Sequence, residues 1–320
     1  MKAELMEIGI KAKEAAGKMA LLETNKKNEV LNCVAKNLIK DAKTLIAENA
    51  KDMEAGKANG MPEGLLDRLL LTEKRIEQMA EGLEQVAALD DPIGEVLSMK
   101  KRPNGLRIGQ KRVPLGVVGI IYEARPNVTA DAFGLCFKTG NAVILKGGSD
   151  ALHSNIAIVA SIRRTLAECG VDENAIALIE DTSRETTTEF MKMNGYVDVL
   201  IPRGGAGLIR AVVENATVPV IETGTGNCHI YVDESADLDM AVNIIFNAKT
   251  QRIGVCNACE SLVVHENIKD ALLPKLAERL KEKNVEMRGD KASQEACSDI
   301  IPASDEDWGK EYLDYILSIK

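Results

Sequence analysis

Cysteine carries the most reactive side chain in this sequence, and Cys256 is the strongest candidate nucleophile. It lies in the stretch Arg252-Ile-Gly-Val-Cys256-Asn-Ala, just after a turn expected at Gly254. A thiol held by that turn near a helix N-terminus would have a lowered pKa, because the helix dipole stabilises the thiolate. A thiolate can attack a carbonyl carbon and form a thioester. Position alone is weak support, since one cysteine among seven is most often a buried apolar residue.

Cys256 and Cys259 also form a C-x-x-C pair, which has two other interpretations. A redox dithiol is one, although a thioredoxin-like motif opens a helix after an early strand. Half of a zinc site completed by Cys228 and His229 is the other, although these ligands are adjacent and zinc sites use spaced pairs. Both interpretations stay open at this point but are disfavoured, and no metal site is expected.

Composition limits the kind of protein that positions these residues. The chain has 320 residues, of which 45% are hydrophobic and 28% are charged, as in a folded globular protein of about two domains. The net charge of −9 disfavours a nucleic-acid partner. No apolar run is long enough to cross a membrane, and the N-terminus does not resemble a signal peptide. Scattered cysteines suit a reducing compartment, so we expect a cytoplasmic protein.

The order of the predicted elements indicates an α/β fold. Helical periodicity extends to about residue 90, with one amphipathic helix expected from Ala20 to Met53 and another that begins at Glu73 after a Thr72 cap. Short apolar strands and helices then alternate, which predicts βαβ units and a parallel sheet. The predicted strands cover residues 116–122, 141–145, 175–179, 197–201 and 218–221.

Two further features complete the predicted architecture. Pro103-Asn104-Gly105 separates two strand-like arms and predicts a hairpin over residues 96–113, which is either a surface hairpin or an arm that pairs with another subunit. A second α/β unit is expected to begin near Gly226. The predicted domains are therefore residues 1–225 and 226–320.

Four segments occur in an order that resembles the aldehyde dehydrogenase superfamily. They are a strand before Asn127, a strand that ends in Lys146-Gly-Gly-Ser149, the motif Glu222-Thr-Gly-Thr-Gly followed by Ala-Asp-Leu-Asp, and Gly-Val-Cys256. The octapeptides YEARPNVT, ETGTGNCH and QRIGVCNA are similar to those of the gamma-glutamyl phosphate reductases within this superfamily. The resemblance covers essentially the whole chain. It implies a parallel-sheet cofactor domain followed by a second α/β catalytic domain.

The resemblance also implies a reaction and roles for three residues. Cys256 would attack the acyl carbon of gamma-glutamyl phosphate and expel phosphate, and hydride from NADPH would lead to glutamate 5-semialdehyde, a step of proline biosynthesis. The Asn127 side-chain amide and the Cys256 backbone N–H would stabilise the oxyanion. Glu222 lies where hydrolytic members keep a general base for water. Because this reaction needs no water, Glu222 could instead tune the thiol or hold a loop.

The resemblance further implies a site for NADPH or NADP. The run Lys146-Gly147-Gly148-Ser149 matches the segment that binds the adenosine ribose, where NAD-preferring members often have a glutamate at the Ser149 position. Serine removes the repulsion of a 2′-phosphate and Lys146 supplies positive charge, which favours NADPH. Gly204 and Gly205 would let backbone amides approach the pyrophosphate at a helix N-terminus.

Other expectations concern the substrate, partners and extent of the chain. Arg125 and Arg252 are candidates for binding the substrate carboxylate, with structural ion pairing as the alternative. The resemblance implies a homo-oligomer and a functional association with glutamate 5-kinase. Resembling proteins continue beyond Lys320 with a tail that pairs with a partner subunit, so we expect an incomplete second domain and an unpaired strand at 311–320. A hydrolytic or CoA-acylating activity, or a non-catalytic fragment, remains the alternative.

Overall fold

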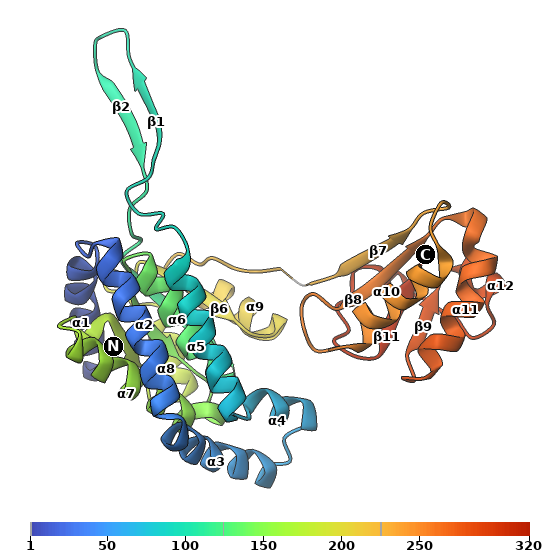
Figure 1. Ribbon diagram of the computed structural model, residues 1–320, viewed down its shortest axis with the longest axis horizontal. Helices are drawn as coiled ribbons and strands as arrows, with labels where there is room; N and C mark the ends of the chain where they lie inside the picture. Colours follow the sequence, from blue (N-terminus) through green and yellow to red (C-terminus); the bar gives the residue numbers. More distant parts are fainter. Residues whose placement is uncertain (1, 124, 225) are drawn as a thin grey trace. The chain divides into compact units, whose positions relative to one another are not determined.

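The chain folds into two compact units, Met1–Thr223 and Gly224–Lys320, in this computed structural model (Figure 1). The structure describes residues 2–123, 125–224 and 226–320. Thr225, the last residue of the predicted first domain, lies outside the described residues.

The first unit is built on a four-stranded parallel sheet with the order β5-β4-β3-β6. The strands are β3 (Val117–Tyr122), β4 (Ala142–Lys146), β5 (Ile176–Leu178) and β6 (Val199–Arg203). This sheet confirms the predicted α/β class. The fifth strand predicted at 218–221 is wrong: this segment makes only an isolated bridge between Val220 and Leu200, beside Pro219, which lacks the N–H that a strand needs.

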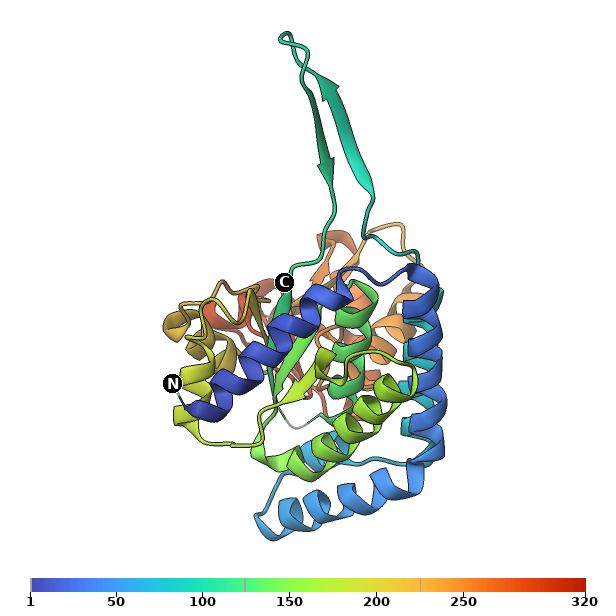
Figure 2. The ribbon, with the colours of Figure 1, turned by 90° about the vertical axis from the view of Figure 1, so that its left-hand side faces the viewer.

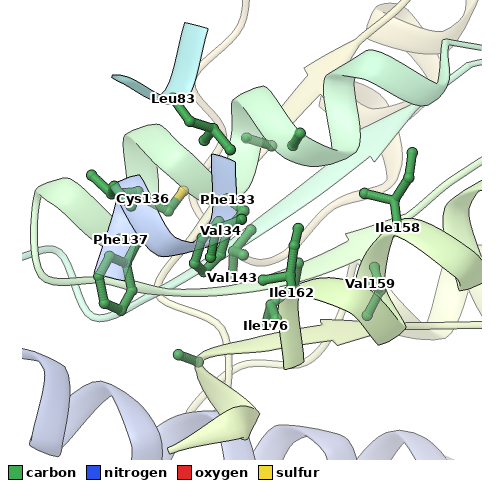
Figure 3. Packing of buried hydrophobic residues seen from close by; sticks show 14 of the residues in the cluster. Val34, Leu83, Phe133, Cys136, Phe137, Val143, Ile158, Val159, Ile162 and Ile176 are labelled. Atoms are coloured by element: carbon green, nitrogen blue, oxygen red, sulfur yellow. The ribbon is translucent and has the colours of Figure 1, made fainter. Parts of the chain in front are cut away.

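Helices cover both faces of this sheet, as Figure 2 shows. Val118, Ile120 and Tyr122 of β3 pack into a core with α2, α5, α6 and α7, part of which appears in Figure 3. Val117 and Ile121 face the opposite way, towards α1. The described helices of this unit are α1 (Ala3–Met19), α2 (Thr24–Lys40), α3 (Ala42–Ala58), α4 (Glu63–Leu69), α5 (Glu73–Ala88), α6 (Pro126–Lys138), α7 (Leu152–Glu168), α8 (Arg184–Phe190) and α9 (Ala206–Asn215).

The N-terminal helices differ in one respect from the prediction. The single helix expected from Ala20 to Met53 is wrong, because α2 ends at Lys40 and α3 begins at Ala42. Between them, the Asp41 carboxylate accepts hydrogen bonds from Ser161 and Arg164 of α7, which fixes the corner. The Thr72 cap is confirmed, since its side chain accepts a hydrogen bond from the Arg75 N–H.

The predicted hairpin forms an antiparallel ribbon of β1 (Val96–Lys101) and β2 (Arg107–Lys111). Figures 1 and 2 show that it extends away from the helices of its unit. Apolar side chains on the ribbon are largely exposed; they include Val96, Leu97, Met99, Leu106 and Ile108. The ribbon therefore contributes little to the core of the first unit.

The second unit contains a five-stranded parallel sheet with the order β10-β9-β11-β8-β7. The strands are β7 (Cys228–Val232), β8 (Cys259–Val264), β9 (Glu286–Gly289), β10 (Ile301–Pro302) and β11 (Ile316–Ile319), and the helices are α10 (Leu238–Thr250), α11 (Lys269–Lys281) and α12 (Lys291–Ala296). The prediction of an unpaired final strand is wrong, because β11 pairs with both β8 and β9. None of the described helices in either unit is long and apolar enough to cross a membrane.

Candidate active site

Cys256 lies in the loop 251–258, between the end of α10 and the start of β8. The expectation that it opens a helix is wrong, because turns and then strand β8 follow it. The helix dipole therefore gives no support to the predicted role of Cys256 as a nucleophile. Its side chain is nevertheless exposed to solvent, as a nucleophile requires.

Solvent exposure separates Cys256 from most of the other thiols. Only Cys228 and Cys256 are exposed among the seven cysteines, all of which the structure describes as free thiols. Burial raises the pKa of Cys136 to about 12 and that of Cys259 to about 11. A thiol that stays protonated is a poor nucleophile at neutral pH, so these two are unsuited to attack.

The alternative interpretations of the C-x-x-C pair receive no support from this geometry. Cys259 is buried, and its thiol donates to the Ser261 carbonyl at 3.4 Å. Among the residues that the structure describes, no group of three or more His, Cys, Asp and Glu side chains is placed to hold a metal ion.

The segment Gly226–Cys228 packs against the Cys256 loop. The Cys228 thiol donates to the Cys256 carbonyl oxygen at 3.4 Å. A Cβ atom on Gly226 would lie 2.8 Å from the same oxygen, so only glycine permits this approach. The glycine at the end of this motif thus has a structural reason: it lets the backbone at Gly226 approach the Cys256 loop closely.

Asn127 lies in the first turn of α6, directly after Pro126 at the first helical position. Its Nδ2 donates to the Asp131 carboxylate at 3.0 Å. A side-chain amide has two N–H donors, so the second remains available for an oxyanion. Desolvation raises the pKa of Asp131, and the hydrogen bond from Asn127 and the charge of Arg203 oppose this rise.

The remaining predicted substrate-site residues lie in different parts of the chain. Glu222 is exposed in an irregular segment after the bridge at Val220, and Arg125 precedes α6. Arg252 is exposed in the Cys256 loop and makes no ion pair with any residue that the structure describes. Arg125 and Glu222 belong to the first unit, whereas Arg252 and Cys256 belong to the second.

The sheet of the first unit has a topological switch point between β3 and β6. The chain moves from β3 to β4 and β5, then returns to place β6 on the other side of β3. Ligands of open α/β sheets bind outside the carboxyl ends of the strands at such a point. Lys146 ends the adjacent strand β4, and Gly204 follows β6.

Lys146 and Gly147 are held tightly at the end of β4. The Lys146 side chain is buried, and its Nζ donates to the Gly147 carbonyl at 3.1 Å. Burial lowers the pKa of Lys146, while the charge of Asp181 raises it. A Cβ on Gly147 would meet the Asn155 amide nitrogen at 2.5 Å, and this buried amide nitrogen has no hydrogen-bond partner among the described residues. Gly148 and Ser149 follow at the more exposed start of a 3₁₀ turn.

The N-terminus of α9 forms an anion site at the same edge of the sheet. The Gly205 N–H donates to both carboxylate oxygens of Glu123 at 3.2 Å, and a Cβ on Gly204 would lie 2.7 Å from the Glu123 carboxyl carbon. The N-terminus of α7 is closed instead by Asp52, which accepts from the Ser154 N–H at 2.8 Å. Glu123 is absent from the predicted set, although its position directly after β3 is a signal for it.

Known proteins resemble this chain over almost its whole length. Residues 2–315 match the aldehyde dehydrogenase family. The sequence is 60% identical over 316 residues to a gamma-glutamyl phosphate reductase of Lachnospira eligens, which covers 99% of this chain and 76% of that protein. A gamma-glutamyl phosphate reductase of Clostridium perfringens is 58% identical over 320 residues, covering 100% of this chain and 77% of the relative.

Solved structures agree with these matches. The crystal structure of gamma-glutamyl phosphate reductase from Thermotoga maritima superposes with a TM-score of 0.92 at 47% identity, over 99% of this chain and 77% of that one. A propionaldehyde dehydrogenase from Rhodopseudomonas palustris has a TM-score of 0.66 at 18% identity, over 98% of this chain and 74% of its own, and shares the fold alone.

Proposed function

Because the chain belongs to the aldehyde dehydrogenase family and, within it, to the gamma-glutamyl phosphate reductases, we propose that it reduces gamma-glutamyl phosphate to glutamate 5-semialdehyde and phosphate in proline biosynthesis. The observation that carries the assignment is the match over nearly the whole chain, including the exposed Cys256. The alternative CoA-acylating or hydrolytic activities have no comparable support in the described residues.

The nucleophile of the proposed reaction is the Cys256 thiolate. Its sulfur attacks the acyl carbon, the bond from that carbon to the phosphate oxygen breaks, and phosphate leaves with the bonding electrons. The free N–H of the Asn127 amide and the Cys256 backbone N–H stabilise the negative charge that develops on the carbonyl oxygen. Cys256 then carries the glutamyl group as a thioester until reduction releases the semialdehyde.

Membership of the aldehyde dehydrogenase family implies a nicotinamide cofactor, which supplies the hydride when it is bound. The described residues fit this group, because the N-terminus of α9 follows β6 and presents backbone N–H groups, one of which already binds a carboxylate, that of Glu123. We propose that the segment 146–149 holds the adenosine ribose and that Gly204 and Gly205 hold the pyrophosphate. The charge of Lys146 and the absence of an acidic side chain at Ser149 favour NADPH.

Glu222 and two arginines complete the proposed site. Arg252 is exposed, carries no competing ion pair in the described part of the chain and is suited to bind the substrate carboxylate. Arg125 is the second candidate for this role. We expect Glu222→Gln to retain reductase activity, since no water needs activation; a large loss of kcat would place Glu222 in the thiol chemistry instead.

The substrate is the one partner that the reaction requires. We propose in addition a homo-oligomer that uses the β1–β2 ribbon, and a cytoplasmic association with glutamate 5-kinase, which would supply the acyl phosphate.

The decisive experiment measures NADPH formation from glutamate 5-semialdehyde and NADP with and without inorganic phosphate. We expect a phosphate-dependent rate that falls to background in Cys256→Ala. Cys33→Ala is the matched control, because it removes a partly exposed thiol from α2 of the first unit. Equal rates for the unaltered chain and Cys256→Ala would refute the proposal, and a product that forms only with CoA would assign a different activity.

A further inference from the structure

The two ends of the Cys256 loop are joined by a buried ion pair that has no part in the proposed chemistry. Lys249 lies in the last turn of α10, before the loop, and Glu260 is the second residue of β8, after it. The Lys249 ammonium donates to the Glu260 carboxylate at 2.8 Å. Their side chains are only 0% and 1% exposed, so the pair closes the loop from inside the unit.

Glu260 is fixed by more than this pair. Its second carboxylate oxygen accepts from the Leu313 backbone N–H at 3.2 Å, where Leu313 has a φ of 54°, a left-handed conformation uncommon for a residue with a side chain. Its backbone carbonyl accepts from the Ser318 hydroxyl at 3.2 Å. Glu260 therefore ties the end of α10 to β11 and to the chain that precedes it.

Stability of the second unit does not by itself account for a pair in this position. Taking two charges out of water is costly, and replacing such a pair with well-packed uncharged side chains is often neutral or stabilising. The apolar core of this unit includes the fully buried Ile245, Leu262 and Leu317. A charged pair restricts the relative position of two side chains more than an apolar contact does, because an ammonium and a carboxylate must meet in a defined geometry.

The loop between Lys249 and Glu260 has no regular secondary structure to fix its conformation. Residues 251–258 form turns and bends without regular structure, and Cys256 at their centre is exposed. One side of the loop rests on Gly226 and Cys228, as described above. The ion pair fixes the two ends, so the position of the Cys256 sulfur depends on both supports.

We propose that Lys249 and Glu260 are positioning residues that hold the Cys256 loop in its reactive conformation; this inference rests on the reductase function proposed above. Neither side chain touches the substrate. Their contribution is the placement of the sulfur, and a displacement of about 1 Å can lower a catalytic rate by about a hundredfold.

The test compares Lys249→Met, Glu260→Gln and the double variant. Each single change leaves a buried group without its partner and is expected to lower the melting temperature strongly. The double variant removes both charges and keeps an acceptor for the Leu313 N–H, so we expect its melting temperature to lie above those of both single variants. Lys281→Met with Asp299→Asn is the matched control, because it removes an exposed ion pair of the same unit.

Two measurements on the double variant separate positioning from stability. Hydrogen exchange followed by mass spectrometry should show faster exchange in residues 250–258, with α11 unchanged. In the phosphate-dependent assay, kcat should fall about tenfold to a hundredfold, with the KM for NADP unchanged. Loop exchange and kcat equal to those of the control would overturn the inference. If Cys256→Ala were as active as the unaltered chain, the proposed function would fail instead, while the exchange measurement would still test the loop.

Discussion

Glu123 is the residue whose contacts most affect the proposed cofactor site. Its carboxylate occupies the N-terminus of α9 through the Gly205 N–H, where a pyrophosphate would bind. In the proposed binding mode, the carboxylate and the phosphates are both negative and would use the same donor. Cofactor binding would then displace Glu123, and the free energy of that displacement would weaken the observed affinity.

We expect Glu123→Gln to bind NADPH more tightly, because glutamine carries no charge to compete for the helix N-terminus. The expected decrease in Kd is about two- to fivefold, the size of a charge effect at an exposed helix end. Calorimetric titration with NADPH measures it directly. Glu214→Gln, which removes an exposed charge near the other end of α9, should leave the Kd unchanged. Weaker binding in Glu123→Gln would mean that this carboxylate holds the cofactor.

Asp131 controls the donor that we assign to the oxyanion. Its carboxylate binds one N–H of Asn127, which leaves the other in a fixed direction. Desolvation raises the pKa of Asp131, so protonation on acidification begins at a higher pH than for an ordinary aspartate. The charged acceptor is present above this raised pKa and is lost as the pH falls through it.

We therefore expect kcat to decrease on the acidic side in the unaltered chain, and the decrease to be absent in Asp131→Asn, whose kcat is lower at neutral pH. Asn127→Ala should lower kcat further, by about a hundredfold or more, which is the typical effect of removing an oxyanion donor. Steady-state kinetics from pH 5 to 8 would test both variants. An unchanged acidic limb in Asp131→Asn would assign that limb to another group.

At the scale of elements, local sequence patterns predicted the strands better than the helix boundaries. The run Val117–Tyr122 is apolar throughout because both of its faces are buried, so composition alone identified β3. The corner at Asp41 escaped prediction, because apolar periodicity continues from α2 into α3 while the turn depends on contacts with α7. The apolar segment around Val220 was mistaken for a strand, since pairing partners are not visible in composition.

The residues of the candidate site also differ in this way: sequence motifs indicate some of them, whereas only contacts between separate elements reveal the others. Cys256 and Lys146 are proposed from motifs whose order resembles that of the aldehyde dehydrogenase superfamily, and such motifs can be read from the sequence. The cap that Asp52 supplies to α7 and the pair of Lys249 with Glu260 were not predicted, since each joins separate elements. The helix expected after Cys256 was wrong for a related reason: a turn at a glycine can lead into a strand as readily as into a helix.

At the scale of the whole molecule, contacts within one chain do not explain the exposed apolar side chains of the β1–β2 ribbon. Its strands pair only with each other among the described residues, so their outer edges offer free N–H and C=O groups. Met99 and Ile108 are 62% and 50% exposed. Apolar side chains beside free strand edges are suited to pairing with another strand, and a second copy of the chain offers an identical ribbon.

We expect Ile108→Glu to weaken self-association by about tenfold or more, because a carboxylate would replace an apolar contact in the interface. Gln110→Glu is the matched control, since it adds the same charge two residues further along the same face of the same strand. Sedimentation velocity over a concentration series measures both, and circular dichroism verifies that each variant remains folded. Equal dissociation constants for the two variants would show that the Ile108 contact does not form the interface, whereas a monomeric unaltered chain would exclude the ribbon as a self-association arm.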